Sequence, residues 1–172
     1  LIEYLEQNPE IGVAFNPGTY QIKAGVERLE NMLAATDVLF VNTREAKILT
    51  NQKADTSIQE LHNLLQKLGP KLTIITDGEN GSSAFDGQNL VAVGIYKDLR
   101  PVVDKTGAGD AHSAGVLAAL HHGKDLETAL KWGTLNSGSV IRQIGSINGH
   151  VTLDEMEEAL KQKPEFEPVH TS

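Results

Sequence analysis

Short runs of β-branched and apolar residues alternate with segments of helical periodicity along most of this chain of 172 residues. Three runs are the strongest strand candidates: Ile11 to Phe15, Val38 to Val41 and Leu72 to Thr76. Each is too short and too uniformly apolar for a surface helix, and is typical of a strand buried on both faces. Strands separated by helices predict an α/β fold with a mostly parallel sheet.

Helical spacing and capping signals mark the intervening segments. Ser57 with Glu60 three residues later is a capping box, and Gly69-Pro70 ends the helix that it opens. Gly123 is expected to end one helix and Asp125 to begin the next. The helices predicted in this way are 26–33, 57–68, 111–122, 126–144 and a last one that begins at Thr152.

The pattern changes after Thr76. Turn residues at 77–81 and at Asp86-Gly87 bracket the short apolar run Ser82 to Phe85, and another run covers Leu90 to Val93. Runs joined by such short turns predict antiparallel strands, added here to one edge of the sheet.

Composition excludes several classes of function. The 15 Lys and Arg residues against 23 Asp and Glu give a formal net charge of −8, which argues against a nucleic-acid partner. The chain has no cysteine, so disulfides, cysteine-ligated metals and thiol catalysis are excluded. No apolar run is long enough to span a membrane, and we expect a cytoplasmic protein with no membrane partner. The length predicts a single domain over residues 1–172.

A loop of small residues, Asp104 to Asp110, lies between an apolar run and the helix expected from Ala111. Backbone N–H groups at the start of a helix attract anions, so this loop can hold a phosphate. A carboxylate beside a phosphate needs a separate task, and Asp110 is placed to act as a general base toward a hydroxyl. The alternative is a glycine-rich turn whose aspartate only caps the helix.

The same loop resembles the C-terminal signature of the PfkB, or ribokinase-like, family of small-molecule kinases, Asp-x-x-Gly-Ala-Gly-Asp. The resemblance implies that Asp110 is the catalytic base. It also implies that the anion hole consists of the N–H groups of Gly107, Ala108 and Gly109. Lys105 is less usual for the family. The resemblance further implies that Asp104 and Thr106 help to bind a monovalent cation such as K⁺.

Two further strand ends are similar to motifs of this family. Asn42 and Glu45 match its Asn-x-x-Glu motif, which organises Mg²⁺, often through water. The alternative for this pair is a plain helix cap. Thr76, Gly78 and Gly81 match a turn beside the ATP phosphates and ribose, with a simple hairpin turn as the alternative.

The adenine base would lie near Asn136 and the run Gly145 to Asn148, as the resemblance implies. It therefore predicts a ribokinase-like fold and an ATP- and Mg²⁺-dependent kinase that phosphorylates a hydroxyl of a small sugar or nucleoside, of ribokinase, fructokinase or adenosine kinase type. The alternative is a truncated nucleotide-binding module without catalytic activity.

The resemblance runs from about Phe15 to Asn148, and the family's N-terminal portion has no counterpart. With Leu1 in place of an initiator Met, we expect residues 1–172 to be the C-terminal, nucleotide-binding part of a ribokinase-like domain. An unpaired edge at the strand Ile11 to Phe15 would then favour a homo-oligomer.

Two rival enzyme classes use a similar strand-loop-helix segment. A dinucleotide site would need a third glycine where His112 stands. A serine hydrolase would use Ser113, which is expected inside the helix and beyond the turn that such a nucleophile needs. A Walker-type site is excluded because its Gly-Lys-Ser/Thr is absent.

Overall fold

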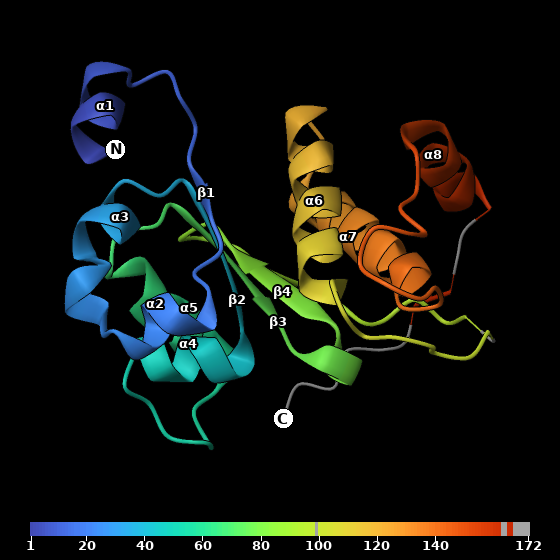
Figure 1. The fold of residues 1–172 in the computed structure, drawn as a ribbon, viewed down its shortest axis with the longest axis horizontal. Helices are drawn as coiled ribbons and strands as arrows, with labels where there is room; N and C mark the ends of the chain where they lie inside the picture. Colours follow the sequence, from blue (N-terminus) through green and yellow to red (C-terminus); the bar gives the residue numbers. More distant parts are fainter. Residues whose placement is uncertain (99, 163–164, 167–172) are drawn as a thin grey trace. The chain divides into compact units, whose positions relative to one another are not determined.

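The computed structural model describes residues 1–98, 100–162 and 165–166 (Figure 1). One five-stranded sheet has the order β1-β2-β3-β4-β5. The strands are β1 (Ala14–Phe15), β2 (Val38–Asn42), β3 (Leu72–Thr76), β4 (Ser82–Phe85) and β5 (Leu90–Val93). β1, β2 and β3 run parallel, as the sequence predicted. Neighbouring strands joined by loops as short as those before and after β4 must be antiparallel, because a parallel connection needs a dozen or more residues.

Helices occupy the segments between and after the strands. They are α1 (Ile2–Gln7), α2 (Thr19–Lys23), η1 (Val26–Arg28), α3 (Glu30–Ala34), α4 (Thr43–Leu49), α5 (Ile58–Gln66), η2 (Gly78–Asn80), α6 (Ala108–His121), α7 (Leu126–Val140) and α8 (Leu153–Lys161), where η denotes a 3₁₀-helix. Among the described residues, none of these helices has the length and apolar character needed to cross a bilayer.

The chain divides into two compact units, described here separately. Unit 1 contains Leu1–Asp77 and Ser83–Leu90, and unit 2 contains Gly78–Ser82 and the described chain from Val91 onward. In unit 1, fully buried leucine and isoleucine side chains of α3, β2, α5 and β3 form the core: Leu33, Leu39, Leu61, Leu65 and Ile75. Burial of each such side chain contributes about 1.5–3 kcal/mol.

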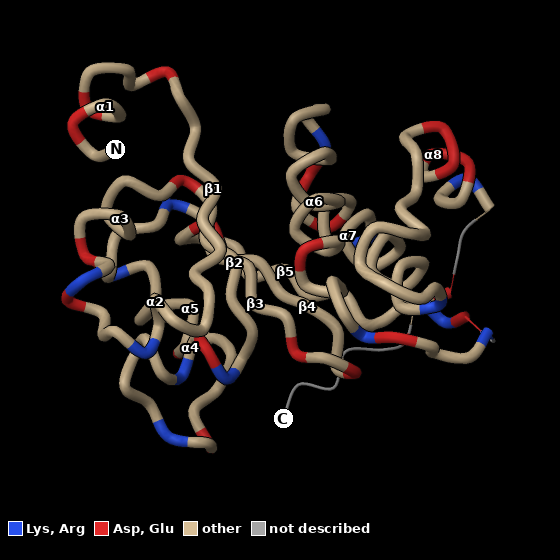
Figure 2. The backbone as a smooth tube through the Cα atoms, viewed as in Figure 1, with Lys and Arg blue, Asp and Glu red and all other residues tan. Residues whose placement is uncertain are grey.

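In unit 2, α6 and α7 pack at backbone distance (Figure 1). A Cβ atom on Gly115 would lie 2.7 Å from the carbonyl oxygen of Trp132, and one on Gly133 would lie 2.8 Å from that of His112. The two glycines therefore permit the close crossing. α8 buries Met156, and its acidic residues, Asp154, Glu155, Glu157 and Glu158, are exposed (Figure 2).

One expected strand is shorter in the structure, and one expected helix is divided into two. The strand expected from Ile11 covers only Ala14–Phe15, because both backbone groups of Val13 bond to the next segment. The N–H of Val13 donates to Asp37 Oδ2 at 2.7 Å, and its carbonyl accepts from the N–H groups of Asp37 and Val38. The helix expected over 26–33 is divided into η1 and α3 at Leu29, whose N–H bonds three residues back to Val26.

The other helix boundaries shift by a few residues. α6 begins at Ala108 and not at Ala111, and α7 ends at Val140 and not at residue 144. The Ile141 carbonyl accepts hydrogen bonds from the N–H groups of Val103 and Asp104, so α7 is held at its end by a distant segment. The caps predicted at Ser57, Asp125 and Thr152 are confirmed.

A histidine that the sequence analysis did not single out lies in the core of unit 1. His62 of α5 is fully buried, with Nδ1 2.7 Å from Thr73 Oγ1 and Nε2 2.8 Å from Ser83 Oγ. Burial lowers the pKa of His62 from 6.5 to about 4. The ring is therefore neutral in the folded protein at pH values where the unfolded chain already protonates it.

This difference predicts a loss of stability in mild acid. The contribution of His62 is complete above pH 6.5 and is lost as the pH falls toward 4, since only the unfolded chain binds a proton in that interval. At 1.36 kcal/mol per pKa unit, the loss is about 3 kcal/mol. Urea denaturation between pH 7 and 4 should show a shallower pH dependence for His62→Gln than for the wild type. His121→Gln, an exposed change on α6, should leave the slope unaltered, and an unaltered slope in His62→Gln would contradict the prediction.

Candidate active site

The loop before α6 has the geometry of an anion site. Gly107 is the N-cap with φ +80°, and no side chain caps the helix. The first helical hydrogen bond runs from the Ala111 N–H to the Gly107 carbonyl at 2.9 Å, while the Ala108 N–H lies 3.3 Å from the Lys105 carbonyl. The N–H groups of Gly109 and Asp110 precede the helical ladder, at the positive end of the helix dipole. This end of α6 can therefore hold a phosphate.

Asp110 lies in the first turn of α6 and is exposed. The alternative in which it only caps the helix is wrong, because Gly107 occupies the cap position. The side chain of Lys105 lies 3.7 Å from Glu79 in an exposed ion pair, a contact of little energetic weight.

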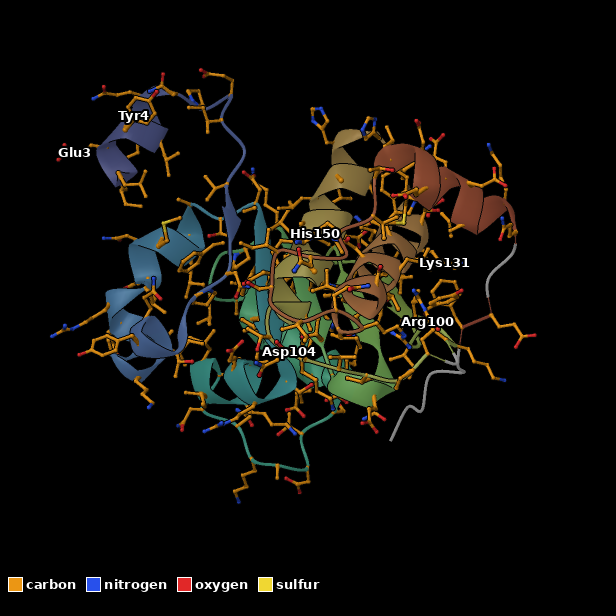
Figure 3. All side chains as sticks on the ribbon, turned by 45° about the vertical axis from the view of Figure 1, so that its right-hand side comes forward. Glu3, Tyr4, Arg100, Asp104, Lys131 and His150 are labelled. Carbon is orange, nitrogen blue, oxygen red and sulfur yellow. The ribbon has the colours of Figure 1, made fainter. Side chains whose placement is uncertain are left out.

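Asp104 holds the start of the loop (Figure 3). Its Oδ1 accepts from the Thr106 N–H at 2.9 Å and its Oδ2 from the Gly145 N–H at 3.1 Å. Hydrogen bonding from the Thr106 side chain, and then from the two backbone N–H groups, lowers the pKa of Asp104. The carboxylate therefore joins the loop to the turn after α7. A monovalent cation at Asp104 and Thr106 stays a prediction.

The turn at 145–149 packs directly on this loop. A Cβ atom on Gly107 would lie 2.5 Å from Ser146 Cβ, so a side chain at Gly107 is excluded by the turn as well as by the positive φ. Ile147 on this turn and Ile144 directly before it are 84% and 77% exposed. The turn thus sets the backbone of the anion loop and carries exposed apolar side chains beside it.

Asn136 of α7 is 5% exposed, and its amide is used inside the fold. Its Nδ2 donates to the Ala111 carbonyl at 2.8 Å and lies 3.3 Å from His150 Nδ1, while its Oδ1 accepts from the Val151 N–H at 3.0 Å. His150 Nε2 lies 3.3 Å from the Ser146 carbonyl (Figure 3). Asn136 therefore holds the turn in place. That Asn136 contacts a nucleotide stays a prediction, and its hydrogen bonds within the fold do not support it.

In unit 1, Asn42 and Glu45 form the capping box of α4. Asn42 Oδ1 accepts from the Glu45 N–H at 2.9 Å, and Glu45 Oε2 accepts from the Asn42 N–H at 2.9 Å. Within the described part of the chain, Glu45 Oε1 makes no hydrogen bond. There, no group of three His, Cys, Asp or Glu residues could hold a metal. An ion beside Glu45 would keep most of its waters, as Mg²⁺ commonly does.

The ends of β2 and β3 are neighbours. Asn42 is the register partner of Thr76, and Thr43 Oγ1 donates to Asp77 Oδ1 at 2.6 Å. In this parallel pair the two predicted motifs meet at the carboxyl edge, where open α/β sheets bind ligands.

The two glycines after Thr76 differ in how much space surrounds them. Gly81 is required by the fold, because a Cβ atom there would lie 2.2 Å from the Val93 carbonyl oxygen. Gly78 has φ +57°, and a Cβ atom there would meet no atom within 4 Å. The hairpin-turn alternative therefore accounts for Gly81 by close packing and for Gly78 by its positive φ, and the space beside Gly78 is open.

The rival enzyme classes find no support in these positions. Ser113 lies inside α6, and its Oγ donates to the Gly109 carbonyl at 3.0 Å. The serine nucleophile of a hydrolase would instead lie at a strand-to-helix turn. His112, at the third position of the dinucleotide pattern, is 4% exposed with Nε2 3.0 Å from Ser82 Oγ. Neither residue is placed for the chemistry of its class.

The predicted site residues are divided between the two units. Unit 1 brings Asn42 and Glu45 together with Thr76. Unit 2 contains Gly78 and Gly81 of the turn, the loop from Asp104 to Asp110 and Asn136. Sequence reasoning missed Arg142, two of whose carbonyl partners are 42 and 44 residues away and leave no local signal.

Comparisons with known proteins identify the family of the chain. The family model described as pfkB family carbohydrate kinase matches residues 7–153. The cytidine kinase of Thermococcus kodakarensis is 30% identical over 137 residues, which are 78% of this chain and 48% of that kinase. The 5-dehydro-2-deoxygluconokinase of Lacticaseibacillus casei is 31% identical over 160 residues, which are 92% of this chain and 48% of the relative. The chain spans about half the length of the curated relatives it matches.

Solved structures show the same fold. The crystal structure of the Methanocaldococcus jannaschii nucleoside kinase superimposes with a TM-score of 0.74 at 27% identity, covering 88% of this chain and 48% of that one. The adenosine kinase from Sinorhizobium meliloti gives a TM-score of 0.76 at 29% identity, covering 93% and 47%. The fold is ribokinase-like, and the chain belongs to the pfkB family of carbohydrate kinases.

Proposed function

We propose that residues 1–172 form the C-terminal, nucleotide-binding part of a ribokinase-like domain, in a kinase that transfers the γ-phosphoryl group of ATP to a hydroxyl of a small sugar or nucleoside. The observation that carries this proposal is the anion loop at the start of α6, followed by the exposed carboxylate of Asp110. The family of the chain and the names of its relatives support it.

In the proposed reaction, the hydroxyl oxygen of the acceptor attacks the γ-phosphorus, and the bond from that phosphorus to the bridging oxygen of ADP breaks. Asp110 accepts the proton of the hydroxyl. The N–H groups of Gly107, Ala108 and Gly109 stabilise negative charge on the transferred group, and the Ala108 N–H would share its long bond to the Lys105 carbonyl with the phosphate. Asn42 and Glu45 would hold Mg²⁺ through water, where the ion neutralises phosphate charge.

We also propose roles for the turn after β3 and for Asp104 and Thr106, a location in the cell and an oligomeric state. Thr76, Gly78 and Gly81 line the phosphates and ribose, and the open space at Gly78 supports this part. Asp104 and Thr106 are the proposed ligands of K⁺. The proposed location is the cytoplasm, and the end position of β1 in the sheet supports a homo-oligomer.

A single methyl group tests the anion loop. A Cβ atom on Gly109 would meet no protein atom within 4 Å, so Gly109→Ala should stabilise α6 by up to about 1 kcal/mol. If the Gly109 N–H faces a phosphate, the methyl group should weaken Mg-ATP binding about tenfold, because the phosphate must move away. Nuclear magnetic resonance titration of the 172-residue chain measures the affinity for Mg-ATP and, separately, for adenosine. The affinity for adenosine should be unchanged. Undiminished Mg-ATP affinity would assign this loop to the fold alone.

A conservative change at Glu45 separates metal binding from capping. Gln retains the oxygen that accepts the Asn42 N–H, so Glu45→Gln should leave the melting temperature within about 1 °C. If Glu45 organises Mg²⁺, the Mg²⁺ concentration needed for ATP binding should rise about tenfold, because the ligand loses its charge. An identical Mg²⁺ titration for both proteins would leave Glu45 with a capping role only.

The second candidate is a nucleotide-binding module without catalytic activity. Release of ADP on addition of pentoses, hexoses or nucleosides distinguishes the two. Acceptor-dependent turnover supports the kinase, while nucleotide binding without turnover supports the module.

A further inference from the structure

Arg142 follows the end of α7 and is an unusually buried arginine. Its side chain is 8% exposed. Nε donates to the Arg100 carbonyl at 3.1 Å, Nη2 donates to the Asp98 carbonyl at 3.1 Å, and Nη1 donates to the Gly138 carbonyl. One guanidinium thus joins the last turn of α7 to the segment that precedes the anion loop.

A carboxylate completes this contact. Asp98, whose side chain is 10% exposed, places Oδ2 3.1 Å from Arg142 Nε. The hydrogen bond from the Arg100 side chain is the largest cause that lowers the pKa of Asp98, and the charge of Arg142 contributes. Because a buried charge is tolerated only when it is paired and hydrogen-bonded, Arg142 and Asp98 depend on one another. The Arg100 side chain is 61% exposed (Figure 3), and its Nε and Nη2 donate to the Asp98 carboxylate.

The contact continues into the anion loop through backbone hydrogen bonds. The Ile141 carbonyl, one residue before Arg142, accepts from the N–H groups of Val103 and Asp104 at 2.8 and 3.1 Å. The Asp104 carboxylate then holds the N–H groups of Thr106 and Gly145. Arg142 and the neighbouring Ile141 therefore hold two successive parts of the chain that leads to α6, first Asp98 and Arg100 and then Val103 and Asp104.

We propose that Arg142 is the positioning residue of the anion loop. It fixes Asp98 and the segment from Arg100 to Asp104 against the end of α7, and this sets the N–H groups at the start of α6 in place for a phosphate. Arg142 itself does not touch the ligand. The part of this proposal that concerns phosphate rests on the proposed function, whereas the part that concerns the loop does not.

Hydrogen exchange of the 172-residue chain tests the structural part. Arg142→Met keeps the length of the stem and removes the forked donor. We expect exchange of the Val103, Asp104, Thr106 and Gly145 N–H groups to become faster by about tenfold or more, since these bonds open with the segment. Amides of α8 should be unaffected. Arg100→Met is the matched control, because it removes an arginine from the same aspartate without removing the carbonyl contacts, and it should change exchange less than about twofold.

Arg142→Lys provides a second test in case Arg142→Met does not fold. Lysine retains the charge beside Asp98 but lacks the fork that binds three carbonyls, so the same amides should still exchange faster. The double variant Asp98→Asn with Arg142→Met should be no worse than Arg142→Met alone if the two residues act as a unit. Unchanged exchange in both Arg142 variants, or faster exchange spread evenly over unit 2, would overturn the proposal.

Ligand binding tests the functional part. Arg142→Met should bind Mg-ATP about tenfold more weakly and adenosine equally well, because adenosine has no phosphate for the loop to hold. Equal loss for both ligands, or no loss for Mg-ATP despite faster exchange, would overturn the positioning role. Failure of the wild-type chain to bind Mg-ATP would instead count against the proposed function, and the exchange measurements would still decide the role of Arg142 in the loop.

Discussion

Replacing Asp110 by asparagine is expected to lower the rate of phosphoryl transfer by about 100- to 10,000-fold. Asparagine has nearly the same shape as aspartate but cannot accept the proton of the acceptor hydroxyl. Affinity for Mg-ATP should remain almost unchanged, because the effect is confined to the transition state. The measurement is acceptor-dependent release of ADP, made on a form of the protein that turns over a sugar or nucleoside, together with a separate titration of Mg-ATP.

The matched control for this change is Asp125→Asn, the same substitution in the same unit. Asp125 caps α7 by accepting from the Thr128 N–H at 2.8 Å, and asparagine caps a helix equally well. The control should keep both the rate and the stability of the wild type. Wild-type turnover by the Asp110→Asn protein would end the assignment of Asp110 as the base.

Replacing Gly115 by valine should destabilise the protein by about 4 kcal/mol or more, because the side chain has no space between α6 and α7. A Cβ atom there would lie 2.7 Å from the Trp132 carbonyl oxygen and 2.9 Å from the Gly133 Cα, and neither backbone atom can turn aside. Since α6 carries Asp110 and α7 carries Asn136, separation of the helices should also disrupt the candidate site. Chemical denaturation followed by circular dichroism measures the change in stability.

Gly138→Ala on α7 is the control for this prediction. A Cβ atom there would have its nearest neighbours at 3.6 and 3.9 Å, which is ordinary contact. The alanine should leave the free energy of unfolding unchanged or raise it by up to about 1 kcal/mol, as helix propensity predicts. A Gly115→Val protein as stable as the control would show that the two helices are not packed at backbone distance.

Elements whose hydrogen bonds close within a few residues could be predicted from the sequence. The caps at Ser57, Asn42 and Thr152 bond three residues ahead, so their partners are visible as local patterns. The same is true of the loop from Asp104 to Asp110, in which glycines, the cap and the helix start are contiguous.

Contacts over long sequence distances could not be predicted in this way. The Arg142 guanidinium meets the Asp98 carbonyl 44 residues away, and the Val13 N–H that shortens β1 meets an Asp37 carboxylate 24 residues away. Asn136 matched a family position, yet its amide is used by a segment 15 residues further along. The type of a side chain shows which hydrogen bonds it can make, but the tertiary structure determines which group is its partner.

The sequence by itself determined the alternation of strands and helices, the parallel start of the sheet and the order of the motifs, because hydrophobic periodicity and capping are local properties. Only the tertiary structure decided where α7 ends, which glycines of the turn after β3 are structural, and that Asn136 and His62 serve the fold. His62 and Asn136 are buried polar groups that must find a partner, whereas the end of α7 and Gly81 are set by close contacts with other segments. The chain brings these contacts together only when it folds.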